Sequence, residues 1–360
     1  MNEASFIPKS VKSTVDSGSF TWESPSNIAL VKYWGKKKDQ IPENPSISFT
    51  LNQCKTSTKL SFSKKENSDD YSFDVFLDGQ KKPDFKPKIE TFFKRVEVYL
   101  PFLKDYHFKI ETSNTFPHSS GIASSASGMS ALALCFMSVE KLLNDGKISN
   151  QFFVKKASFL ARLGSGSACR SIEGPLVVWG EHGSIEGSSD LFGVKYPYEA
   201  HQNFNDYQDT ILLVDRGEKQ VSSTVGHNLM YGHPFALERF KQAGQNLENL
   251  ISILKNGDLD DFIKIVESEA LTLHAMMMTS LPYFILMKPN TLSIINKIWE
   301  FRKETGSKVC FTLDAGANVH VLYPEIEKET VLKFINNELV AYCENGHYIC
   351  DVIGLGANEI

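Results

Sequence analysis

The stretch TFPHSSGIASSASG (residues 115–128) decides how the rest of the sequence is interpreted. A strand-like run, FKIET (108–112), precedes it, and a run of helix-forming residues follows it. A Gly/Ser loop between a strand and a helix offers free backbone amides and hydroxyls, and the helix dipole favours negative charge there. The stretch lacks the Walker and dinucleotide patterns. An anion site and a structural turn capped by Ser124 and Ser125 therefore explain it about equally well.

Length and composition place the chain among globular proteins with more than one core. It has 360 residues, of which 42% are hydrophobic and 22% are charged, so two domains are expected. The net charge of −5 gives no electrostatic case for a nucleic-acid partner. No long apolar run predicts a membrane span, and the N-terminus lacks an apolar signal core. The six cysteines show no C-x-x-C spacing, so reduced thiols in a cytoplasm are expected, without a disulfide framework or a zinc site.

The first half of the chain mixes strands and helices. Residues 1–20 are polar and rich in serine, and we expect this segment to be partly mobile. Alternating runs predict strands at 27–34, 46–51, 55–63 and 71–77, with a hairpin turn at Asp78-Gly79. Helices are predicted at 86–100, 125–144 and 150–163, and a strand at PLVVW (175–179).

The second half repeats this mixture. A strand is predicted at 209–215 and a helix at 234–255, which Gly257 ends before Asp258 caps the next helix. KVCFTL and NVHVLY, at 308–313 and 318–323, predict a strand pair. The fold class is therefore α+β with mostly antiparallel sheets. We expect an N-terminal domain at 21–200 and a C-terminal domain at 201–360.

Four segments carry a resemblance to a known family. The 115–128 loop resembles the phosphate loop of the GHMP small-molecule kinase superfamily. The other three segments resemble the N-terminal, central and C-terminal signatures of the diphosphomevalonate decarboxylase family, in the family's order. They are SPSNIALVKYWGKKKDQIPENPSISFTL (24–51), ARLGSGSACRSIEGPLVVW (161–179) and FTLDAGANVHVLYP (311–324).

The resemblance implies a reaction and a two-lobed GHMP fold with the active site between the lobes. The family phosphorylates the tertiary 3-hydroxyl of mevalonate 5-diphosphate with ATP, and the product then loses phosphate and carbon dioxide to give isopentenyl diphosphate. ATP as co-substrate, Mg²⁺ and a homodimer are implied with it. Such a reaction brings two clusters of anionic charge into one cleft, which demands cations, backbone amides and a carboxylate near the hydroxyl.

The resemblance implies three catalytic residues. Asp314 would orient or deprotonate the 3-hydroxyl, Lys32 would keep Asp314 ionised, and Arg170 would hold the substrate carboxylate. Without the resemblance, Asp314 would be interpreted as a structural turn residue and Lys32 as a solvated charge on a strand. A helix end at Gly164 would account for one glycine of the central signature, but not for its serines and arginine.

Further residues are implied to bind the two substrates. Lys36 is preferred over Lys37 and Lys38, which more simply face water, and Lys88 is the nearest counterpart of a family arginine. Cys169 is expected to pack rather than to act as a nucleophile. The substrate set is Tyr33, Trp34, Gly35, Lys36, Lys88, Ser165, Gly166, Ser167, Ala168, Cys169, Arg170, Ser223 and Thr224. The ATP set is Ser119, Ser120, Gly121, Ser124 and Ser125, with Ser124 also a candidate magnesium ligand.

The sequence departs from the family pattern at several positions. His227 stands where the family usually has methionine, and this change is expected to affect the phosphate pocket. Ala317 replaces a proline, Pro45 replaces a serine, and His118-Ser119-Ser120 replaces Thr-Ala-Ala. His274, on a predicted helix, is expected to be buried and hydrogen-bonded rather than to be a ligand.

Three other functions compete with the diphosphate decarboxylase. A monophosphate decarboxylase is suggested only by Lys88 and His227. A kinase that does not decarboxylate is disfavoured, because Asp-Ala-Gly stands where such kinases have a Gly-rich loop. A non-catalytic binding protein is disfavoured because Lys32, Arg170 and Asp314 are all present.

Overall fold

The computed structural model describes residues 2–8, 14–66, 70–117, 122–215 and 223–360, and their strands form two sheets. The first sheet contains β1 (Ser17–Val31), β2 (Ser46–Lys64), β3 (Ser72–Leu77), β4 (Gln80–Lys81), β5 (Tyr106–Asn114), β6 (Leu176–Trp179), β7 (Val194–Lys195) and β12 (Asn358–Glu359). Its main order is β12-β1-β2-β5-β3-β4, with β6 on β2 and β7 on β6. The second contains β8 (Gln208–Leu212), β9 (Cys310–Thr312), β10 (Val319–Tyr323) and β11 (Tyr348–Val352), in the order β11-β8-β10-β9.

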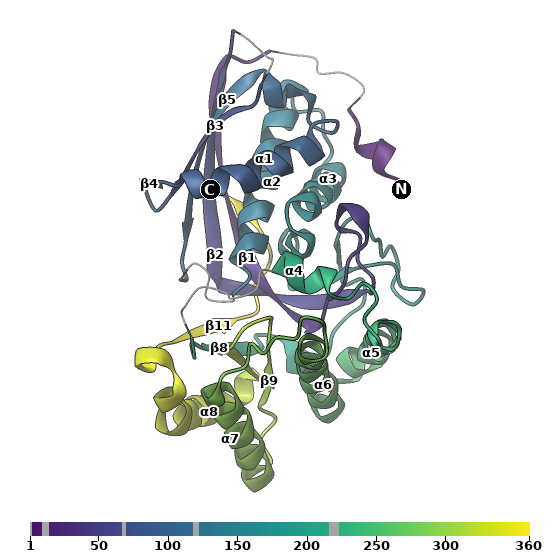
Figure 1. Cartoon of the computed structure of the whole chain (residues 1–360), viewed down its shortest axis with the longest axis vertical. Helices are drawn as coiled ribbons and strands as arrows, with labels where there is room; N and C mark the ends of the chain where they lie inside the picture. The colour runs from purple at the N-terminus through teal and green to yellow at the C-terminus, as the bar shows by residue number, and fades with distance from the viewer. Residues whose placement is uncertain (1, 9–13, 67–69, 118–121, 216–222) are drawn as a thin grey trace.

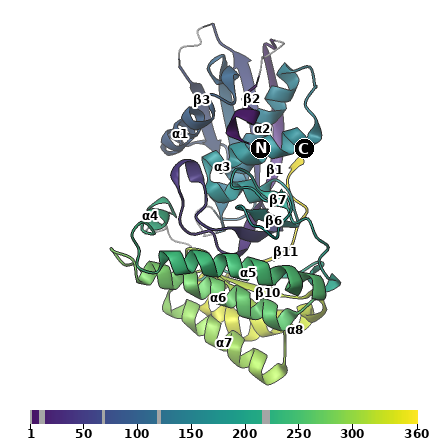
Figure 2. The same ribbon diagram turned by 90° about the vertical axis from the view of Figure 1, so that its right-hand side faces the viewer.

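Helices are grouped around each sheet. The helices are α1 (Lys86–Val96), α2 (Ser124–Leu143), α3 (Asn150–Gly164), α4 (Ser223–Asn228), α5 (Ala236–Asn256), α6 (Leu259–Met278), α7 (Pro289–Thr305) and α8 (Lys328–Phe334). The first three cover one face of the first sheet, and α4 lies near the junction of the two halves (Figure 1). Helices α5, α6 and α7 lie beside the second sheet (Figure 2).

The predicted fold class is confirmed. Among the described strands, only β3 and β5 pair in parallel, and all other pairs are antiparallel. Asp78 and Gly79 form the predicted hairpin turn, with φ of 51° and 77°. Gly257 ends α5 with φ of 73°, and the side chain of Asp258 accepts a hydrogen bond from the amide of Asp261 at 3.1 Å. The turn and the helix cap that were predicted from local residue types are therefore both present in the fold.

Strand β2 is longer than predicted, because two predicted strands, 46–51 and 55–63, are one. The residues between the two predicted strands continue the strand, because a buried carboxylate accepts hydrogen bonds from their backbone amides. Asp351 accepts hydrogen bonds from the amides of Asn52, Gln53 and Cys54 at 2.9, 2.7 and 2.7 Å. This residue lies 299 positions away from Asn52, so local sequence carries no sign of it.

The first residues contain an anchor that the expectation of a polar, partly mobile segment missed. A short 3₁₀ helix, η1 (Glu3–Phe6), places Phe6 in the core with 0% exposure. Its ring stacks on Phe159 of α3 at a centroid distance of 4.4 Å. Arg162, also on α3, donates a hydrogen bond to Glu3 at 3.2 Å. One aromatic side chain thus ties the N-terminus to the first sheet's helices.

Helix α2 is long and apolar enough to span a membrane by length and composition, with a mean hydropathy of 1.3. However, 83% of that window is buried inside the protein. It packs on β1 and β2 and against α3. Its apolar composition is therefore accounted for by its position in the core.

The end of the chain returns to the first sheet. After β11, Ile353 bridges Leu51, and β12 then pairs with β1 through Trp22 and Glu359. The division into 21–200 and 201–360 remains a prediction. Apart from β12, the strands of the first sheet come before residue 201 and those of the second sheet come after it. The return fastens the two sheets to each other at a second point besides the 195–208 connection.

We predict that Phe6→Ala lowers the free energy of unfolding by about 3–4 kcal/mol, because it removes a buried aromatic ring from the core. Urea unfolding followed by far-UV circular dichroism measures this loss. The neighbouring Ile7, which is 44% exposed, gives the matched control Ile7→Ala, expected to change stability by less than about 0.5–1 kcal/mol. Equal, small effects of both changes would show that the N-terminal segment does not anchor the fold.

Candidate active site

A cavity between elements of the two sheets gathers side chains from distant parts of the sequence. One wall follows the end of β1, another is the turn after α3, and a third is the connection between β9 and β10. The predicted residues that line it are Lys32, Tyr33, Trp34, Lys36, Ser125, Ser165, Gly166, Ser167, Arg170 and Asp314. The structure therefore brings together side chains from all three signatures and from the start of α2.

Lys32 and Asp314 form the ion pair at the centre of this cavity. Lys32 Nζ lies 3.2 Å from Asp314 Oδ1. The lysine side chain is 2% exposed and that of Asp314 is 28% exposed, so the carboxylate meets the cavity and the ammonium lies behind it. Burial lowers the pKa of Lys32, and the negative charge of Asp314 opposes that shift. Lys32 lies one residue beyond β1, not within it as predicted.

The backbone of Lys32 is held by a second, deeper charge pair that the sequence analysis missed. Glu269 of α6 accepts a hydrogen bond from the Lys32 amide at 2.8 Å, and from Arg239 Nη1 of α5 at 2.9 Å. Asn246 donates to the same carboxylate at 2.6 Å, and Asn44 donates to the Lys32 carbonyl at 3.0 Å. Glu269 is 0% exposed, so this network locks the end of β1 onto two helices.

Arg170 is held in a fixed orientation by two serines of β2. It belongs to the 3₁₀ helix η5 (Gly166–Ser171) and is 3% exposed. Its Nε donates to Ser48 Oγ at 3.0 Å, and its Nη1 donates to Ser46 Oγ at 2.6 Å. The structure records no partner for Nη2 among the described residues. A guanidinium held in this way keeps a donor for an anion in the cavity.

Tyr33 forms the wall between η5 and α4. Its ring packs edge-on against Trp179 at 4.6 Å, and its buried hydroxyl has no hydrogen-bond partner in the described part of the chain. A Cβ atom on Gly166 would lie 2.9 Å from that hydroxyl, so the close approach requires glycine. An unpaired buried hydroxyl is costly, which favours a ligand oxygen as its partner.

Cys169 and Ala168 lie behind the cavity and not on its surface, with 1% and 0% exposure. The Cys169 thiol donates to the Gly166 carbonyl at 3.1 Å, and burial raises its pKa to about 12. The thiol is therefore a packing group, as predicted. Gly35 also lies outside the set of lining residues, but its φ of 95° turns the chain between Trp34 and Lys36.

Lys88 does not line the cavity that Lys36 lines, and its assignment to the substrate diphosphate stays a prediction. It lines a second cavity with Ser124, Ser125 and Gly128 at the start of α2, bounded on the other side by strand residues such as Thr56. The distance along the sequence from the hairpin gave the position of Lys88 along α1. It did not give the side of the helix on which Lys88 lies. Ser125 lines both cavities and joins them.

Some predicted residues lie outside what the structure describes. Ser119, Ser120 and Gly121 fall in the undescribed residues 118–121. Ser223 and Thr224 begin α4, but their side chains are not described. Helix α2 begins at Ser124 after Ala123, which has φ of 40°, and no side chain of the described residues caps it. Simple capping by Ser124 or Ser125 therefore does not explain this loop.

Two histidines adjoin the cavity and both are buried. His274 is 1% exposed, and its Nε2 lies 3.1 Å from the backbone oxygen of Asp314, which confirms that it is a hydrogen-bonded core residue. Burial lowers its pKa to about 4. His227 lines the cavity itself, and the amide of Gly35 donates to its Nδ1 at 3.0 Å. From the sequence, His227 was expected only to affect the phosphate pocket, as a departure from the family pattern.

The oxygen atoms that border the cavity suit a magnesium ion whose other ligands are substrate phosphates and water. In the described residues, no three His, Cys, Asp or Glu side chains are arranged to hold a metal. One carboxylate, Asp314, and the hydroxyls of Ser125 and Ser165 border the cavity. Magnesium is usually bound through one or two carboxylates together with substrate phosphates and water. The donor set therefore fits such an ion.

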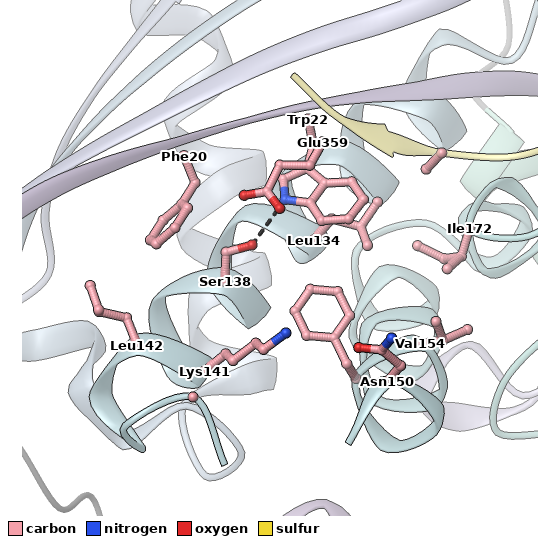
Figure 3. A pocket seen from close by; sticks show the side chains of 13 residues that line it. Phe20, Trp22, Leu134, Ser138, Lys141, Leu142, Asn150, Val154, Ile172 and Glu359 are labelled. Atoms are coloured by element: carbon pink, nitrogen blue, oxygen red, sulfur yellow. Dashed lines mark hydrogen bonds between the residues drawn. The ribbon is translucent and has the colours of Figure 1, made fainter. Parts of the chain in front are cut away.

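A third cavity, of about 530 Å³, lies apart from these residues, between β1, α2 and α3 (Figure 3). Its lining includes Trp22, whose indole nitrogen donates to Ser138 Oγ at 2.9 Å, and Phe153, over which Lys141 lies at 5.8 Å. None of the residues predicted for catalysis lines it. The Lys32–Asp314 ion pair and Arg170 line the first cavity instead.

We predict that Glu269→Ala lowers the free energy of unfolding by about 3–5 kcal/mol, because it leaves the buried Arg239 guanidinium without its partner. Thermal and urea unfolding measure the loss. The matched control is Glu238→Ala, which removes an ion pair with Lys241 whose side chains are 75% and 73% exposed, and which should change stability by about 0–1 kcal/mol. A loss in Glu269→Ala no larger than in this control would show that Arg239 is solvated in the folded protein.

Comparison with known proteins agrees with this arrangement. Residues 24–190 match the diphosphomevalonate decarboxylase-like N-terminal domain, and residues 210–351 match the mevalonate 5-diphosphate decarboxylase C-terminal domain. A diphosphomevalonate decarboxylase of Ganoderma lucidum is 29% identical, with 93% of this chain and 84% of the relative covered. The human diphosphomevalonate decarboxylase is 27% identical, with 88% and 78% covered.

Solved structures show the same fold. The mevalonate diphosphate decarboxylase of Staphylococcus aureus gives a TM-score of 0.80 at 28% identity, with 96% of this chain and 98% of that chain covered. A related structure in complex with MVAPP, AMPPCP and magnesium gives 0.81 at 27% identity, with 96% and 99% covered. The two domain models together span most of the chain, in the order found for the sheets. The chain therefore belongs to the diphosphomevalonate decarboxylase family.

Proposed function

We propose that this protein is a carboxy-lyase that converts mevalonate 5-diphosphate and ATP to isopentenyl diphosphate, ADP, phosphate and carbon dioxide. The observation that carries the proposal is the Lys32–Asp314 ion pair, 3.2 Å long, in one cavity with Arg170. Family membership supports the same reaction. ATP is the co-substrate and Mg²⁺ the metal, as in the relative bound to AMPPCP and magnesium.

Asp314 acts on the 3-hydroxyl of the substrate. Its carboxylate accepts the hydroxyl proton as the oxygen attacks the γ-phosphorus of ATP, the new O–P bond forms, and the bond to ADP breaks. Lys32 favours the ionised form of Asp314 through its positive charge. Asp314 and Ser125 would help to hold magnesium, which would neutralise charge on the phosphates when bound.

Arg170 acts on the substrate carboxylate in the second stage. The C3–oxygen bond to the new phosphate breaks, and the electrons of the bond to the carboxylate carbon form the double bond as carbon dioxide leaves. The guanidinium is fixed by Ser46 and Ser48, so it holds the carboxylate in place without reorganising. The rings of Tyr33 and Trp34 and the side chain of Leu273 form the apolar part of the cavity wall, and they limit water at the reacting carbon.

The second cavity suits the nucleotide. It lies at the start of α2, where free amides and the helix dipole favour phosphate. Ser125 borders both cavities, so a nucleotide in the second cavity would place its terminal phosphate beside the first. Lys88 then contacts ATP and not the substrate diphosphate.

The assembly and compartment are part of the proposal. We propose a homodimer, supported by exposed apolar side chains such as Leu281, Tyr283 and Ile285, which are 84%, 73% and 62% exposed. We also propose a cytoplasmic location, supported by six free cysteine thiols. Light scattering of the purified protein tests the first proposal.

The function is tested by release of carbon dioxide from mevalonate 5-diphosphate with ATP and magnesium, beside the 5-monophosphate. We expect release that requires ATP and prefers the diphosphate. Preference for the monophosphate would keep the chemistry and change the substrate. Formation of ADP without carbon dioxide would make the protein a kinase and overturn the proposal.

We predict that Asp314→Asn lowers kcat by about 10³-fold or more while the dissociation constant for mevalonate 5-diphosphate changes little, because the amide keeps the shape but cannot accept the proton. Single-turnover kinetics and calorimetric titration separate the two quantities. Retained turnover with lost affinity would contradict a role for Asp314 in the chemical step.

We predict that Lys88→Ala raises the KM for ATP by about tenfold and changes the KM for mevalonate 5-diphosphate by less than about twofold, because Lys88 lines the second cavity only. The control is Lys86→Ala on the same helix, whose ammonium lies 3.8 Å from Asp74 Oδ1 and outside both cavities. The opposite split, with only the KM for mevalonate 5-diphosphate raised, would return Lys88 to the substrate diphosphate.

A further inference from the structure

His227 is placed as a binding group, and the structure holds its ring rigidly. The imidazole lies between two aromatic rings, at centroid distances of 4.3 Å from Tyr33 and 4.6 Å from Trp34. Helix α4 packs closely against the same tryptophan at Gly226. A Cβ atom on Gly226 would lie only 2.5 Å from the ring of Trp34. The histidine is 7% exposed and lines the cavity that contains Lys36 and Arg170.

The hydrogen bonds of His227 determine which ring nitrogen carries the proton. The amide of Gly35 donates to Nδ1 at 3.0 Å, so Nδ1 is an acceptor without hydrogen. The neutral ring then carries its proton on Nε2. Burial, together with the positive charges of Lys36 and Arg170, lowers the pKa of His227 to about 3, which keeps the ring neutral at physiological pH.

His233, a second buried histidine, has a purely structural role and serves as a comparison. In His233, which is 8% exposed, Nδ1 accepts from the amide of Phe235 at 3.1 Å, and Nε2 lies 3.1 Å from Thr279 Oγ1. The protein uses both nitrogens of His233. In His227, Nδ1 likewise accepts from a backbone amide, that of Gly35. Unlike Nε2 of His233, however, Nε2 of His227 has no recorded partner in the described ranges.

We propose that His227 binds the diphosphate of the substrate by donating a hydrogen bond from Nε2–H to a phosphate oxygen, and that it thereby contributes to selection of the phosphorylated substrate. The inference rests on the proposed function for the identity of that substrate. Residues that flank His227, Tyr33 to Lys36, are those expected to hold the same diphosphate. A neutral donor adds a hydrogen bond to an anion without adding another cation to a cavity that already holds Lys36 and Arg170.

The test compares His227→Met and His227→Gln with the control His233→Met. Methionine removes the donor at similar size, whereas glutamine restores an N–H group. We expect His227→Met to raise the dissociation constant and KM for mevalonate 5-diphosphate by about tenfold or more, with kcat and the KM for ATP within about twofold of wild type. His227→Gln should recover at least about half of that loss on a logarithmic scale. His233→Met should change stability but not substrate affinity.

Titration calorimetry with mevalonate 5-diphosphate alone separates this inference from the proposed function, because it needs no turnover. Unchanged affinity in His227→Met would overturn the inference while leaving the function intact. An equal loss of affinity in both His227 variants, with a fall in the thermal midpoint, would also overturn it by showing that the Gly35 contact matters instead. A wild-type protein that does not bind mevalonate 5-diphosphate would overturn the function and the inference together.

Discussion

The site depends on a lysine ammonium that the fold buries where its two sheets meet. An unpaired ammonium at this depth would cost several kcal/mol, so Lys32 requires Asp314, which lies in the connection between two strands of the other sheet. Its backbone is fixed separately, because Glu269 accepts from its amide and Asn44 donates to its carbonyl. Arg239 in turn neutralises Glu269. The catalytic Lys32–Asp314 pair and the Glu269–Arg239 pair, which joins the end of β1 to α5 and α6, therefore belong to one hydrogen-bonded network.

The sequence predicted the parts of this site that carry distinctive residue types. Gly166 and Ser167 in the central signature, and Asp314 in Asp-Ala-Gly, stand out from their surroundings, and the structure brings their segments into one cavity. Glu269 and Arg239 did not stand out. Both lie on long amphipathic helices, where charged side chains usually face water. Only their three-dimensional pairing shows that they are buried.

The differences between prediction and structure have physical causes. Lys88 was assigned by its distance along the chain, but distance does not give the face of a helix on which a side chain lies. Strand β2 was predicted as two strands, since Asp351, which accepts hydrogen bonds from the amides between them, comes from the far end of the chain. Phe6 was overlooked as a single aromatic residue in a polar segment, yet its partner Phe159 makes it part of the core. For strand β2 and for Phe6, the missing fact is a long-range contact.

The charge distribution of the first cavity explains why a histidine suits the position after Gly226. Lys32 is neutralised by Asp314, whereas Lys36 and Arg170 remain for the ligand, and the structure pairs neither with a carboxylate in the described residues. A third cation beside these two would be desolvated and repelled in the empty cavity. An imidazole whose Nδ1 is occupied by a backbone amide avoids that cost, because it stays neutral and still presents a donor. The Gly35 turn therefore both shapes the wall and fixes the hydrogen-bonding state of its neighbour.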